Sequence, residues 1–107
     1  LYERYDLKDF SLKVNNIKLN EKKVAYIGKY HGQFNFLGRI KEKIDVINGI
    51  GVEEWFDNNV ESFVIYNHRY MPERTQYIPY LSQKFRGRTL AIWEQRNVSN
   101  KLDIFKK

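Results

Sequence analysis

The sequence predicts a single α/β domain: a three-layer or two-layer sandwich around a mostly parallel sheet of about four strands with an antiparallel edge. Between residues 24 and 66, short apolar runs alternate with segments of helical periodicity. This alternation favours parallel strands joined by right-handed helical crossovers. The 107 residues suit one domain, and a hydrophobic share of 42%, rich in aromatic side chains, is enough for a core.

The first part of the chain predicts a helix, a buried strand and a second helix. Four apolar residues between positions 7 and 17 lie three or four residues apart, so they share one stripe of a helix, and Asp6 precedes them as a candidate N-cap. Residues 24–28 form a short apolar run that ends in glycine, which is typical of a buried strand. Apolar residues on one helical face of residues 32–40 predict a short helix that Gly38 weakens.

The middle of the chain predicts two more strands with a helix between them. Residues 44–47 are mostly β-branched and are followed by Asn48 and Gly49, so we expect a strand that ends in a turn. Residues 52–56 form the apolar side of a short helix whose first turn is acidic, as the helix dipole prefers. Residues 63–66 predict a third buried strand.

The last third predicts a loop, an edge hairpin and a polar tail. Residues 68–76 contain a proline and several charged side chains and are expected to form a loop. Residues 77–81 carry Pro79, which suits an edge strand, and Gly87 separates them from a final strand at residues 90–93. From Glu94 onward the chain is polar, and we expect it to fray.

Composition limits the chemistry that the chain can perform. The absence of cysteine excludes disulfides, cysteine-ligated zinc and thiol catalysis. The net charge of +6 favours anionic partners such as nucleic acid, phosphate or lipid head groups. The alternative is a compositional bias toward lysine, asparagine and isoleucine, since the basic residues are spread along the chain.

The turn after the first predicted strand is the first candidate site. Loops at the carboxyl ends of parallel strands often bind anions, and here Lys29 and His31 could meet a phosphate. The glycine spacing matches neither the dinucleotide fingerprint nor the phosphate loop, and the alternative is that both side chains are merely solvated. The two histidines lack metal-ligand spacing, so no metal or cofactor is predicted.

A second candidate site is the basic segment in which Lys84, Arg86 and Arg88 alternate around Phe85 and Gly87. Its guanidinium groups could bind a phosphodiester or a lipid phosphate, or the segment could simply be a basic hairpin turn. No serine lies in a nucleophile-elbow context. No catalytic residue is predicted.

Two stretches resemble the soluble C-terminal domain of bacterial membrane glycosyltransferases related to 4-amino-4-deoxy-L-arabinose transferase and the protein O-mannosyltransferases. Residues 24–39, VAYIGKYHGQFNFLGR, carry most of this resemblance. Residues 85–93, FRGRTLAIW, are similar to the closing strand of that domain and follow in the expected order.

The resemblance implies a parent enzyme that transfers a sugar from a polyprenyl-phosphate carrier to a lipid or protein acceptor at the periplasmic face of the inner membrane. Residues 1–107 would be one soluble accessory domain of that larger membrane protein, while the catalytic carboxylate would lie between its first membrane helices. The implied partners are the transmembrane part of the same polypeptide and a polyprenyl-phosphate sugar or an anionic lipid surface. The candidate binding residues, in a docking or lid role, are Lys29, Tyr30, His31, Gln33, Arg39, Arg86 and Arg88.

Two other functions remain open at this point. The second hypothesis is a small basic module that binds nucleic acid, based on the net charge of +6 and the interleaved aromatic residues. The third is a free-standing enzyme that acts on an anionic substrate through Lys29 and His31. It ranks last because no nucleophile, base and orienting group converge in the sequence.

Overall fold

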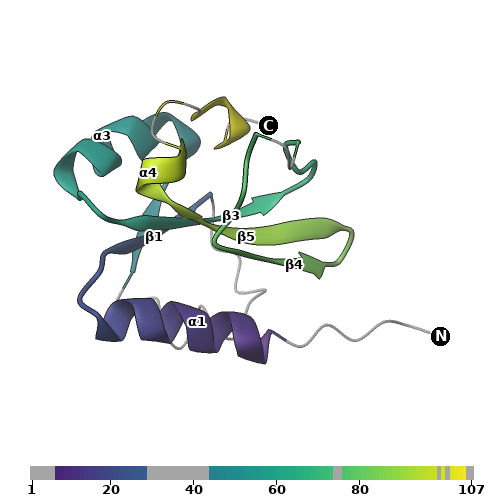
Figure 1. Cartoon of the computed structure of the whole chain (residues 1–107). Coiled ribbons are helices and arrows are strands. Elements are labelled where there is room, and N and C mark those ends of the chain that lie inside the picture. Colours follow the sequence, from purple (N-terminus) through teal and green to yellow (C-terminus); the bar gives the residue numbers. More distant parts are fainter. Residues whose placement is uncertain (1–6, 29–43, 74–75, 99, 101, 106–107) are drawn as a thin grey trace.

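The computed structural model describes residues 7–28, 44–73, 76–98, 100 and 102–105, which form a sheet between two helical layers (Figure 1). The elements, in chain order, are α1 (Lys8–Leu19), β1 (Val24–Ile27), β2 (Asp45–Ile47), the 3-10 helix η2 (Gly49–Gly51), α3 (Val52–Asn58), β3 (Phe63–His68), β4 (Leu81–Phe85), β5 (Arg88–Glu94), α4 (Gln95–Val98) and the 3-10 helix η3 (Leu102–Phe105).

The five described strands lie in the order β2-β1-β3-β5-β4. β1 pairs in parallel with both β2 and β3, whereas β5 pairs antiparallel with β3 and β4. The predicted α/β class and the antiparallel edge are therefore confirmed. The described sheet has five strands where about four were predicted. Two of its four strand pairings are parallel and two are antiparallel.

α1 covers one face of the sheet (Figure 1). Its buried residues are Phe10, Val14 and Ile17, as the apolar stripe predicted. They pack against strand residues of the same face, among them Tyr26 and Ile65. Leu7 occupies the N-cap position without a side-chain cap bond, and the proposed cap Asp6 lies outside the described residues.

α3, α4 and η3 cover the opposite face, so the described chain forms a three-layer sandwich (Figure 1). The core of this layer contains Trp55, Trp93 and Phe105. Trp55 Nε1 donates a hydrogen bond to Asp45 Oδ2 at 2.8 Å, which ties α3 to β2. The helix predicted at residues 52–56 is confirmed and continues to Asn58.

The strand predictions are confirmed for β1, β2, β3 and β5, although β3 continues to His68 and β5 spans seven residues. The strand predicted at residues 77–81 is wrong, because β4 begins at Leu81. Pro79 has no N–H to donate to a ladder, and pairing with β5 begins at Tyr80, whose N–H donates to the Ile92 carbonyl at 2.7 Å.

The expectation of a frayed tail is also wrong. Val98, Ile104 and Phe105 are buried in the core of the α3 layer. The helix predicted at residues 32–40 lies outside the described residues. None of the helices in the described ranges has the length and apolarity to cross a membrane.

Candidate functional site

The carboxyl ends of the three parallel strands lie at one edge of the sheet. β1, β2 and β3 end there at Ile27, Ile47 and His68. The chain moves from β1 to β2 on one side and then returns to β3 on the other side of β1. In open α/β sheets, ligands bind outside the carboxyl ends of strands at such a reversal of strand order. This edge is therefore the candidate functional site.

Gly28 carries the chain away from β1 at this edge. Its φ of +121° lies in a region that side chains rarely adopt, so the turn requires glycine here. Its N–H donates to the Ile47 carbonyl at 2.8 Å, which joins the ends of β1 and β2. The next segment contains five of the predicted binding residues, namely Lys29, Tyr30, His31, Gln33 and Arg39, and it lies outside the described residues.

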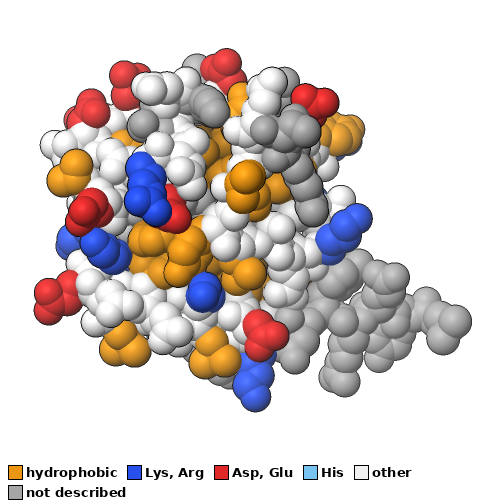
Figure 2. All heavy atoms as spheres, in the orientation of Figure 1, with side chains coloured by type: hydrophobic (Ala, Val, Ile, Leu, Met, Phe, Trp, Pro, Cys, Tyr) orange, Lys and Arg blue, Asp and Glu red, His pale blue; other side chains and the backbone are white. Residues whose placement is uncertain are grey.

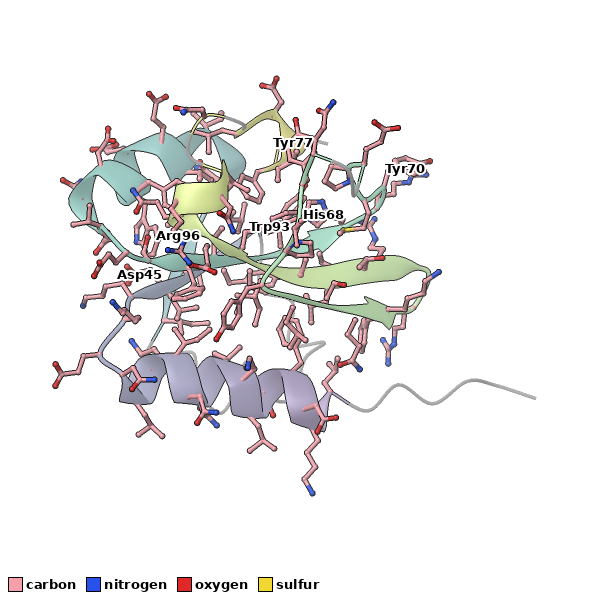
Figure 3. The ribbon with its side chains drawn as sticks, in the orientation of Figure 1. Asp45, His68, Tyr70, Tyr77, Trp93 and Arg96 are labelled. Carbon is pink, nitrogen blue, oxygen red and sulfur yellow. The ribbon has the colours of Figure 1, made fainter. Side chains whose placement is uncertain are left out.

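His68 lies beneath the edge and is a structural residue that the loop prediction missed. Its imidazole is only 1% exposed and accepts a hydrogen bond at Nε2 from Trp93 Nε1 at 2.8 Å. Its ring contacts those of Tyr66 and Trp93 edge-on at centroid distances of 4.6 and 5.4 Å (Figure 3). Because burial disfavours the charged form, the pKa of His68 falls to about 4. The ring is therefore neutral at pH 7.

A hollow of about 370 Å³ opens beside the end of β3. The segment between β3 and β4 forms one side and η3 forms the other. Figure 3 shows Tyr70 and Tyr77 projecting from the first of these, above the buried His68 and Trp93. The described residues that line the hollow combine aromatic, apolar, amide and carboxylate side chains: Tyr70, Met71, Pro72, Glu73, Gln76, Tyr77, Asp103 and Ile104.

This mixture can bind a ligand that has both apolar faces and hydrogen-bonding groups. The phenol rings offer flat apolar surface, while carboxylates and amides accept or donate hydrogen bonds. Of these residues, sequence reasoning singled out only Tyr77, as one of the aromatic side chains interleaved with the basic residues. Residues 102–105 reach the hollow only because the tail packs on the sheet, so no local signal could have identified them.

The basic segment forms the turn of the β4–β5 hairpin at the same end of the sheet. Arg86 and Gly87 have φ values of 50° and 77°, as a two-residue type I′ turn requires. Arg86 lies over the ring of Phe85 with its guanidinium carbon 5.2 Å from the centroid. Burial raises the pKa of the Tyr26 hydroxyl above its ordinary value, and the nearby charge of Arg88 offsets part of this rise. Arg86 thus lies in the exposed turn and Arg88 at the exposed start of β5, both at the end of the sheet that holds the candidate edge.

The described residues contain no group of three or more histidine, cysteine or acidic side chains that could hold a metal ion. No protein-family model, curated protein or solved structure matches the chain.

Proposed function

We propose that this chain is the accessory domain of an integral-membrane glycosyltransferase that transfers a sugar from a polyprenyl-phosphate carrier to a lipid or protein acceptor. The observation that carries the proposal is the position of the segment that resembles those enzymes. Residues 24–27 of that segment are the buried interior strand β1, and Gly28 leaves it at the carboxyl edge. The hollow and the basic turn lie at the same end of the sheet.

The proposed role is to contact the glycosylation substrate while the catalytic groups lie in the membrane part of the enzyme. The hollow suits a ligand rich in hydroxyl groups, because Glu73, Gln76 and Asp103 line it with planar polar groups beside two tyrosine rings. Sugars have this combination of polar rims and less polar ring faces. Contact with the carrier sugar or the acceptor at the hollow would position it for transfer.

The first test of this proposal is the reading frame that encodes the chain. It should contain several apolar stretches of about 20 residues, each able to form a membrane helix. A frame without them removes the glycosyltransferase assignment.

The second test measures sugar transfer in membranes that contain the full-length gene product, with a radiolabelled polyprenyl-phosphate sugar as donor. Replacement of Glu73 by alanine should lower the rate of transfer by about tenfold, as expected when one hydrogen bond to a charged group is lost. Glu53→Ala is the matched control, since Glu53 is also an exposed carboxylate, in the first turn of α3. Equal rates for the wild type and both variants would contradict a role for the hollow.

A further inference from the structure

Four basic residues gather where β3 ends and the β4–β5 hairpin turns. Arg69 directly follows β3, Lys84 lies in β4, Arg86 is in the turn and Arg88 begins β5. The strand register brings them together, because His68 lies opposite Thr89 and Thr89 lies opposite Lys84. We call this group of Arg69, Lys84, Arg86 and Arg88 the basic end; the strand end and the turn that form it lie together in Figure 1.

The four cations of the basic end have no carboxylate partner among the described residues. Elsewhere in the described part of the chain, Lys22 pairs with Glu61 and Arg96 with Glu94, both with 2.9 Å between the charged atoms. These pairs lie at the opposite edge, where β1 and β3 begin and β5 ends. Two cations at that edge are thus paired with carboxylates, whereas the four of the basic end are not, which favours an anionic partner at the basic end.

Aromatic rings lie beside two of these cations. The guanidinium carbon of Arg69 is 5.6 Å from the centroid of the Tyr70 ring, and Arg86 lies over Phe85. Tyr70 is 72% exposed, and Figure 3 shows it projecting outward at this end of the molecule. Tyrosine next to basic side chains is the composition that proteins place at the boundary between lipid head groups and water.

We propose that the basic end is a docking surface for the anionic head groups of a lipid bilayer, with Tyr70 at the level of the head groups. The inference rests on the proposed function, which places the domain beside a membrane, and it adds the orientation in which the domain sits there. The four cations of the basic end form one cluster, although other lysine and arginine side chains are spread over the rest of the visible face (Figure 2). A nucleic-acid surface would instead need basic residues along a groove or stripe that follows a phosphate backbone.

The test measures co-sedimentation of the 107-residue chain with two kinds of vesicle. One kind is phosphatidylcholine alone, and the other contains about one third phosphatidylglycerol. The chain should bind only the anionic vesicles, and binding should weaken as salt rises from about 50 to about 200 mM. Binding that is equal for both vesicles, or absent from both, overturns the proposal.

Two double variants separate the basic end from net charge. The variant Arg86→Gln/Arg88→Gln and its matched control Lys22→Gln/Arg96→Gln each remove two positive charges from the net +6. Each basic residue near an anionic surface contributes about fivefold to binding, so the first variant should bind about 25-fold more weakly. The control should bind within about twofold of wild type, because its cations are already paired with Glu61 and Glu94. Equal losses in both variants would mean diffuse attraction and would contradict the proposal.

Two competitors test whether the basic end recognises a bilayer, a free phosphate ligand or a nucleic acid. Excess glycerol phosphate should not displace the chain from the vesicles, because a docking surface needs the array of head groups that a bilayer presents. Displacement would overturn the proposal in favour of a free phosphate ligand, and displacement by a short oligonucleotide would overturn it in favour of nucleic acid. If sugar transfer is normal but the chain does not bind vesicles, this inference is wrong and the proposed function stands. If the chain binds anionic vesicles but the full-length protein transfers no sugar, the proposed function alone is wrong.

Discussion

His68 shows how one buried polar residue can join two strands of the sheet. It ends β3, and Trp93 of the neighbouring strand β5 donates its indole N–H to the imidazole. The hydrogen bond holds the ring in a layer with Tyr66 and Phe105, whose ring centroids are 5.6 Å apart. A protonated His68 could not accept this bond, because both ring nitrogens would then be donors.

Acid should therefore destabilise the fold through His68. The ordinary pKa of 6.5 applies to the unfolded chain, and the folded pKa is about 4. The contribution of His68 is complete above pH 6.5 and is lost as pH falls toward 4, because the unfolded state takes up the proton first. At pH 4.5 the loss should be on the order of a few kcal/mol of unfolding free energy.

Two measurements check this prediction. Urea unfolding at pH 7 and pH 4.5 should show a larger loss for the wild type than for His68→Gln, which has no imidazole to protonate. The NMR titration of the His68 ring should have its midpoint at a pKa of about 4. A midpoint near the ordinary value of 6.5 would contradict the prediction.

At the scale of elements, the most specific contact is between the two short 3-10 helices. A methyl group built on Gly49 of η2 would lie 2.7 Å from the Phe105 carbonyl oxygen of η3. The backbone of η3 therefore packs directly against the backbone of η2. Only glycine permits this approach, and it lets Phe105 bury its ring in the α3 layer.

The variant Gly49→Ala should accordingly destabilise the protein by about 2 kcal/mol, because η3 must shift to accommodate the methyl group. Gly51→Ala is the matched control in the same 3-10 turn. Its nearest contact would be 3.4 Å, to the side-chain oxygen of Asn48, and its φ of −85° suits alanine. The control should stay within about 0.5 kcal/mol of wild type in urea unfolding. Equal stability of the two variants would mean that η3 does not pack on η2 as described.

At the scale of the whole molecule, two separate cores share one sheet. The core on the α1 face contains no tryptophan, whereas Trp55 and Trp93 both lie in the core on the opposite face. Alternating strand residues contribute to both cores, as when Tyr26 faces α1 and Ile27 faces α3. Loss of either core should thus remove the support of the other.

We therefore expect the two cores to unfold together. The variant Val14→Ala removes two methyl groups from the fully buried face of α1 and should cost about 2 kcal/mol. The urea midpoint should fall equally whether it is read by tryptophan fluorescence, which reports the far core, or by far-ultraviolet circular dichroism. Leu19→Ala, at an exposed position of the same helix, should leave both midpoints unchanged. Separate midpoints for the two probes would show that the two cores unfold independently.

Local patterns in the sequence predicted the parts of this fold that depend on neighbouring residues. The helical stripe through Phe10 and Val14 and the buried run of β1 were confirmed because periodicity directly records which face is buried. The turn at Arg86 was also predicted from a local signal, because Gly87 marks a tight turn. Its function, like that of Lys29 and His31, stays a prediction.

The remaining features depend on contacts between distant parts of the chain. The tail looks polar, yet Ile104 and Phe105 are buried because the α3 face of the sheet needs a cover there. The sequence predicted His68 to lie in a loop, whereas the structure places it at the end of β3, hydrogen-bonded to Trp93 of β5. Tyr70 and Asp103 lie far apart in sequence and line one hollow only after folding.

The sequence by itself determined the α/β class, the position of β1 and the glycine turn at its end, because each follows from hydrophobic period and backbone freedom within a few residues. Only the tertiary structure decided that the sheet has two antiparallel pairings, that the tail closes the second core and that the four cations of the basic end lie together. These features arise from strand register and from packing between residues that are distant in sequence. A local sequence pattern does not specify such contacts.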